Sequence, residues 1–130
     1  MAKVDKQQRK LAREAVLQAL YAKYVSNEEP KKVLQDIKSR YKFDKLTIKF
    51  VDELFSLTVE NSGELDKKIE SSLDNWTIDR LNVIDRLILQ MSLCEMIYLQ
   101  SYDISHKVTI SSALENAKKF SSEDSISFVN

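Results

Sequence analysis

The sequence is poor in the residues that end helices and build turns. Its 130 residues include one glycine and one proline. Few turns are signalled, so long helices joined by short loops are favoured over a fold of many strands. The length and a hydrophobic content of 43% suit one compact domain with one core. We therefore expect an all-α protein that forms a single domain over residues 1–130.

Residues that bind metals or carry out catalysis are equally scarce. Cys94 is the only cysteine and His106, in an expected loop, is the only histidine. An intramolecular disulfide is excluded, and a zinc site of the usual Cys/His type is not expected. Gly63 alone cannot make a glycine-rich phosphate loop. The acidic residues show no paired spacing typical of a glycosidase or a metal site. We expect no enzymatic activity, no cofactor and no metal.

Long hydrophobic runs are also missing. The first ten residues are polar and charged, unlike a signal peptide. The most apolar segment, residues 87–99, is interrupted by Gln90, Ser92 and Glu95, and it is too short to span a bilayer. We expect a cytoplasmic protein without membrane contact.

Apolar residues recur at helical spacing and predict six or seven helices. The first is expected from Lys6 to Val25, capped by Asp5, with Gln8 at the capping-box position. Further helices are expected to open at Pro30, after Asp44, and near Ile78, Ile110 and Ser122. Around Gly63 the pattern leaves two alternatives, a break or a kinked continuous helix.

The helix expected from Ile78 to Leu99 is apolar nearly all round beyond Leu87, which is typical of a buried central helix. Cys94 lies in it and is interpreted as a small core residue. Glu95 interrupts the apolar run. It is either a carboxylate tuned for function or, as we favour, a residue bound to the backbone or to an arginine at the edge of the core.

Charge is distributed unevenly on a chain whose net charge is zero. Residues 1–45 carry 12 Lys and Arg against 6 Asp and Glu, whereas residues 46–130 carry 8 against 14. A basic half indicates an anionic partner, and the alternative is a chance excess of solvated lysines.

The basic charge is concentrated at the start of the first expected helix. Lys6, Arg9, Lys10 and Arg13 recur at helical spacing, and Lys3 extends the stripe. Cations in the first turn oppose the helix dipole, at a cost of about 0.3–1 kcal/mol each. This placement favours a partner that supplies negative charge, such as a phosphate backbone. A solvated face that tolerates the cost is the alternative.

Three segments together resemble the NusB family of transcription antitermination factors. They are RKLAREAVLQALY at residues 9–21, WTIDRL followed by DRLIL and Glu95 within residues 76–95, and KVTI, AKKFS and FVN within residues 107–130. The matches follow family order and spacing over nearly the whole chain. Two features depart from the family. Ser111 and Ser112 replace Asn-Glu, and the chain stops at Asn130, so that either the last helix is short or the sequence is truncated there.

The resemblance implies a helical bundle of two packed subdomains. It implies binding of single-stranded boxA-type RNA from ribosomal operons, together with NusE, a small-subunit ribosomal protein, inside an RNA polymerase antitermination complex. It places Phe128 at the RNA site, with Ser125 and Lys118 or Lys119 nearby, although Phe128 could equally be core. A phenylalanine can stack on an unpaired base.

The same resemblance places Tyr21 and Asp85 opposite NusE, with Arg86 beside them. The alternative is an intramolecular contact between Asp85 and an arginine, with Tyr21 filling a groove between helices. Two other functions stay open: the NusB-like RNA-binding domain of a ribosomal RNA cytosine methyltransferase, and a helical protein-interaction module without RNA affinity. Monomer and homodimer are both compatible with the sequence.

Overall fold

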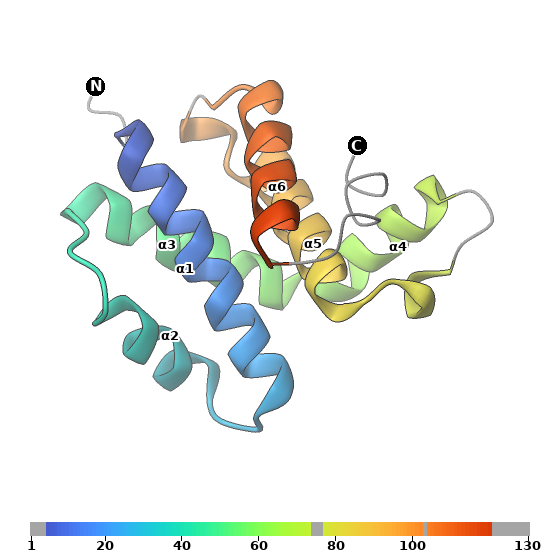
Figure 1. Ribbon diagram of the computed structural model, residues 1–130, viewed down its shortest axis with the longest axis horizontal. Helices are drawn as coiled ribbons and strands as arrows, with labels where there is room; N and C mark the ends of the chain where they lie inside the picture. Colours follow the sequence, from blue (N-terminus) through green and yellow to red (C-terminus); the bar gives the residue numbers. More distant parts are fainter. Residues whose placement is uncertain (1–4, 74–76, 103, 121–130) are drawn as a thin grey trace.

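The computed structural model describes residues 5–73, 77–102 and 104–120, and these ranges fold into six α-helices and two short 3-10 helices (Figure 1). They are α1 (Lys6–Val25), α2 (Pro30–Lys38), α3 (Lys45–Glu60), α4 (Ser62–Ser72), η1 (Ile78–Arg80), α5 (Val83–Tyr98), η2 (Gln100–Tyr102) and α6 (His106–Phe120). The all-α prediction is confirmed. The short helix expected near Ser122 lies outside the described residues.

Polar side chains begin the helices where the sequence predicted them. The Asp5 carboxylate accepts hydrogen bonds from the backbone N–H groups of Gln7 and Gln8, at 3.1 and 3.3 Å. The capping-box prediction for Gln8 is wrong, because its side-chain oxygen instead accepts the Asp44 N–H at 3.3 Å. Asp44 in turn accepts the Thr47 N–H at 2.8 Å, and hydrogen bonds from Thr47 lower the pKa of the Asp44 carboxyl.

The starts of two helices, α5 and α6, differ from the prediction, and one alternative that the sequence left open is decided. Of the alternatives around Gly63, the break is correct, since α3 ends at Glu60 and α4 begins at Ser62. The helix expected from Ile78 begins only at Val83, because Asn82 is extended and its side chain caps α5 by accepting the Asp85 N–H at 2.9 Å. His106, expected in a loop, is the first residue of α6.

Helix α1 packs against α2, α3, α5 and α6, and α5 packs against α4 and α6 (Figure 1). The first three helices and the last three thus form two packed groups, which share one continuous core. Residues from all six helices enter that core, including Val16, Leu34, Phe50, Leu65, Ile88 and Ala113. Cys94 is a fully buried core residue, as predicted, and its burial raises the pKa of the thiol to about 11. No helix in the described ranges is long and apolar enough to cross a membrane.

Candidate nucleic-acid interface

A groove of about 680 Å³ runs between the first halves of α1 and α6, which lie side by side in the same direction (Figure 1). Its α1 side carries Lys6, Arg9 and Lys10, and its α6 side carries Lys107, Ser111 and Ser112. The structure therefore places most of the predicted basic stripe on one wall of a groove. Lys107 was not among the predicted site residues, although it opens the KVTI segment on which the resemblance partly rests.

The cations of this groove are only weakly neutralised by the protein. Lys6 and Lys107 are exposed, and neither forms an ion pair within the described ranges. Lys10 lies 4.0 Å from Glu115, with both side chains more than half exposed, and such a pair contributes little. The Nε of Arg9 is buried without a hydrogen-bond partner in the described structure. The exposed lysines are available to an anion that enters the groove, and Arg9 has a donor group that the described residues leave unsatisfied.

Arg13 departs from the predicted stripe. Its side chain is only 4% exposed, because α6 packs along α1 from Lys10 onward and covers it. The guanidinium forms two hydrogen bonds with Glu95, from Nε to Oε1 at 2.8 Å and from Nη2 to Oε2 at 2.9 Å. Arg13 is therefore not an exposed member of the stripe, and its contact with phosphate stays a prediction. It lies at the floor of the groove as half of an internal ion pair.

Glu95 is bound as the favoured interpretation predicted, to an arginine at the edge of the core. The Thr109 hydroxyl also donates a hydrogen bond to Glu95. Arg13 Nη1 donates to the Ser112 hydroxyl at 3.1 Å, so one of the two serines that depart from the family pattern takes part in this network. The four side chains join α1, α5 and α6 directly beneath the groove.

A second, smaller recess of about 290 Å³ continues along the last turns of α6. Lys118 and Lys119 line it, and both are exposed. Lys119 Nζ lies 3.0 Å from Glu14 Oε1 on α1, which partly neutralises it. The two predicted lysines therefore lie on the same α1–α6 side of the molecule as the basic groove. Lys3, Ser125 and Phe128 lie outside the described residues.

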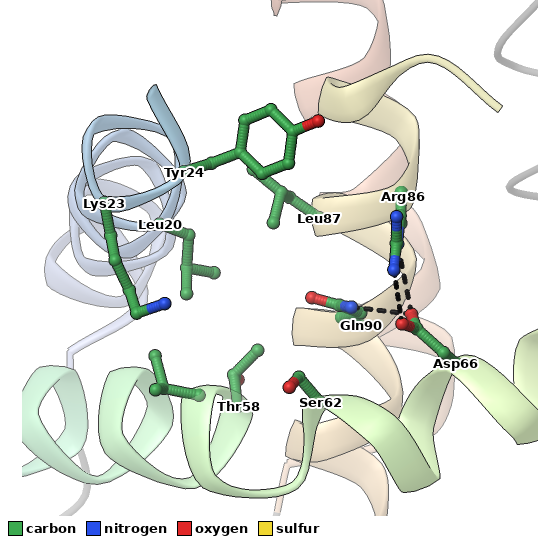
Figure 2. A pocket seen from close by; sticks show the side chains of 10 residues that line it. Leu20, Lys23, Tyr24, Thr58, Ser62, Asp66, Arg86, Leu87 and Gln90 are labelled. Atoms are coloured by element: carbon green, nitrogen blue, oxygen red, sulfur yellow. Dashed lines mark hydrogen bonds and ion pairs between the residues drawn. The ribbon is translucent and has the colours of Figure 1, made fainter. Parts of the chain in front are cut away.

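The residues predicted to face a protein partner do not form one patch. Tyr21 is 41% exposed, but Asp85 is only 2% exposed, because the first turn of α5 is packed inward. The carboxylate of Asp85 is therefore not presented on the surface of this structure, and its contact with a partner stays a prediction. Arg86 is partly exposed and binds Asp66 of α4, with an Nη2 to Oδ2 distance of 2.6 Å (Figure 2). The hydrogen bonding that Arg86 donates to Asp66 is the main cause that raises the pKa of Arg86.

The sequence did not single out the exposed end of α1. Tyr24 is 58% exposed and Val25 is 61% exposed. Their exposure depends on where α2, α3 and α5 pack around α1, and helical spacing alone does not give this information.

The fold and the groove define a small all-helical protein with a basic face between its first and last helices. A family model described as the NusB family matches residues 10–130. The Transcription antitermination protein NusB of Bacillus mycoides (strain KBAB4) is 37% identical over 123 residues, which cover 94% of this chain and 91% of that protein. The protein of the same name from Bacillus cereus (strain B4264) is 36% identical over the same shares.

Solved structures agree with the sequence relatives. A crystal structure of antitermination factors NusB and NusE in complex with dsRNA matches with a TM-score of 0.83 and 25% identity, over 96% of this chain and 92% of that chain. A structure of T. maritima NusB matches with a TM-score of 0.83 and 30% identity, over 98% and 87%. The chain belongs to the NusB family.

Proposed function

We propose that this protein is a transcription antitermination factor that binds RNA in the groove between α1 and α6 and acts together with NusE. The observation that carries the RNA assignment is the set of cations on the walls of the groove, Lys6, Arg9 and Lys107, for which the described residues supply no ion-pair partner. Neutralising phosphates with such side chains releases counterions and drives binding. The relatives named antitermination proteins and the NusB–NusE complex with dsRNA support the same function.

The finer assignments follow the resemblance. The RNA is a single-stranded boxA-type element of ribosomal operons, and the complex with NusE joins an RNA polymerase antitermination assembly. Lys118 and Lys119 extend the RNA site along α6, and Lys3, Ser125 and Phe128 stay predicted members of it. We infer that residues 1–130 act as one domain. The relatives favour this function over the methyltransferase alternative.

The RNA site is tested by reversing charge in the groove. Lys6→Glu combined with Arg9→Glu should weaken binding of a boxA-type RNA by at least tenfold. It should also lower the slope of log K against log salt by about 0.7 for each lost phosphate contact, because fewer counterions are released. A fluorescence anisotropy titration at several salt concentrations measures both quantities.

A matched control makes the same change of net charge elsewhere. Lys31→Glu combined with Lys32→Glu alters two exposed lysines of α2, outside the groove. If this control loses as much RNA affinity as the groove variant, the groove assignment is wrong and only the overall charge matters.

A further inference from the structure

A second pocket, on a different part of the molecule, lies where the end of α1, the junction of α3 with α4, and the first half of α5 meet (Figure 2). Its volume is about 170 Å³. Leu20 and Leu87 give it apolar walls, and both are buried. The polar residues that line it come from four different helices, and their orientation restricts what the pocket can hold.

A hydrogen bond to Asp66 fixes the orientation of the Gln90 side chain. Its Nε2 donates a hydrogen bond to Asp66 Oδ1 at 2.6 Å, and Arg86 donates to both Asp66 oxygens. An ionised carboxylate only accepts hydrogen bonds, so the amide nitrogen must face Asp66 and the carbonyl oxygen must face away from it. Figure 2 shows that oxygen directed into the pocket. Gln90 is only 5% exposed, and no donor within the described residues reaches its Oε1.

The opposite wall presents a donor. Lys23 of α1 directs its ammonium group into the pocket (Figure 2), and it forms no ion pair within the ranges that the structure describes. The hydroxyl of Ser62, at the start of α4, lies across the pocket from Lys23, on the same side as Gln90 (Figure 2). Asp66 is already bound by Arg86 and Gln90, so it does not neutralise Lys23. The pocket therefore holds an unused acceptor on α5 and an unused donor on α1.

A carboxamide matches this pair of groups. Its oxygen can accept from Lys23 while its NH₂ donates to Gln90 Oε1. A carboxylate would meet the Gln90 oxygen with like partial charge, and an ammonium group would meet Lys23. The volume is below the roughly 300 Å³ at which pockets for small-molecule ligands begin, and it suits a single side chain.

The surroundings indicate that the side chain comes from a protein. Tyr24 lines the pocket and is substantially exposed. Tyr21 and Val25, on the same end of α1, are exposed as well, but they line a separate recess between α1 and α2. An exposed aromatic residue at the rim of a small recess is typical of a protein interface.

We propose that this pocket receives the carboxamide of an asparagine or glutamine side chain from the protein partner, held between Lys23 and Gln90. The inference rests on the proposed function, which makes NusE that partner. The sequence predicted that Asp85 contacts NusE, but Asp85 is buried. The pocket supplies a specific contact for that interface instead.

Isothermal calorimetry with purified NusE tests the anchor. Lys23→Met keeps the aliphatic stem and removes the donor, and we expect about a tenfold loss of affinity, as for one hydrogen bond to a charged group. Ser62→Leu places an apolar side chain in the pocket and should weaken binding at least as much. Lys42→Met, an exposed lysine just before α3, is the matched control and should bind like the unaltered protein. Thermal unfolding and RNA binding of all variants should stay unchanged.

A double-mutant cycle identifies the partner side chain. Each asparagine, glutamine, aspartate and glutamate on the NusE surface is replaced with alanine in turn, and we expect the change at one asparagine or glutamine to lose its effect in the Lys23→Met background. Coupling to an aspartate or glutamate instead would overturn the carboxamide assignment. Equal NusE affinity of the unaltered protein, Lys23→Met and Ser62→Leu would overturn the pocket alone. No NusE binding by the unaltered protein would overturn the proposed function, and the inference with it.

Discussion

Arg13 and Glu95 are charged side chains that the fold has almost completely removed from water, since each is only 4% exposed. Removing two charges from water is costly, and two hydrogen bonds between Arg13 and Glu95 offset that cost only while both partners are present. Thr109 and Ser112 occupy further hydrogen-bonding positions of the pair. The network therefore fixes α6 against α1 and with it the spacing of the two walls of the basic groove.

Glu95→Gln should leave Arg13 as an uncompensated buried charge. We expect the free energy of unfolding to fall by about 3–5 kcal/mol, measured by urea denaturation. Glu115→Gln removes the exposed partner of Lys10 and should change it by less than about 0.5 kcal/mol. Similar losses in the two variants would show that the buried Arg13–Glu95 pair contributes no more to the free energy of unfolding than an exposed pair does.

Cys94 gives a pH dependence whose sign can be worked out. Burial raises the pKa of its thiol from the ordinary value of 9.0 to about 11, so between these values the folded state holds a proton that the unfolded state has lost. Stability is therefore full below pH 9 and falls as the pH rises towards 11. Between pH 8 and pH 11 the free energy of unfolding should fall less in Cys94→Ala than in the unaltered protein, and the difference should be about 2 kcal/mol. Urea titrations at pH 8, 9, 10 and 11 measure it. Parallel pH profiles of the two proteins would contradict the raised pKa of the Cys94 thiol.

Individual residues of the site were predictable where the reason was local. Lys6, Arg9 and Lys10 were found because helical spacing is a property of the sequence itself. The buried state of Arg13 and Asp85 was not, because it depends on how α6 packs on α1 and how α5 enters the core. The interpretation of Glu95 succeeded because a carboxylate inside an apolar run needs a donor, whichever helix supplies it.

At the scale of elements, helix boundaries were also predictable where the signal is local and were missed where it is not. Lys6, Pro30 and Lys45 begin helices as predicted, because Asp5, Pro30 and Asp44 are strong local start signals. The start of α5 was placed too early, because the apolar spacing continues from Ile78 through Leu81 and conceals the cap at Asn82. The residues before Asn82 instead form a 3-10 turn, whose Ile78 and Leu81 pack with Ile69 of α4 in a small separate cluster.

The cap at Asn82 predicts a graded effect of substitution. Asn82→Ala removes the acceptor for the Asp85 N–H and should lower the free energy of unfolding by about 1 kcal/mol. Asn82→Asp keeps an oxygen at the same position and should retain most of the stability. Urea denaturation of both variants measures the difference. Equal destabilisation by alanine and aspartate would mean that capping is not the role of this side chain.

At the scale of the whole molecule, α1 connects two surfaces of different character. Its first turns form one wall of the basic groove, and its last turn carries Tyr24 at the pocket of Lys23 and Gln90. Lys6 and Tyr24 are 18 residues apart on one helix, which corresponds to about 27 Å. Charges at one end are screened from the other, because the Debye length is about 8 Å at physiological ionic strength. The two proposed binding surfaces are therefore far enough apart for RNA and a protein partner to occupy them at the same time.

This separation predicts reciprocal losses of binding. Lys6→Glu combined with Arg9→Glu should lose RNA affinity but keep NusE affinity within about twofold, because the altered charges lie several Debye lengths from the end of α1. Tyr24→Ala should lose NusE affinity, because it removes an exposed aromatic contact at the edge of the pocket, and should keep RNA affinity. Calorimetry with NusE and anisotropy with RNA, performed on the same preparations, give all four values. If either variant lost both activities equally while remaining folded, the two surfaces would be one, and α1 would present a single composite interface.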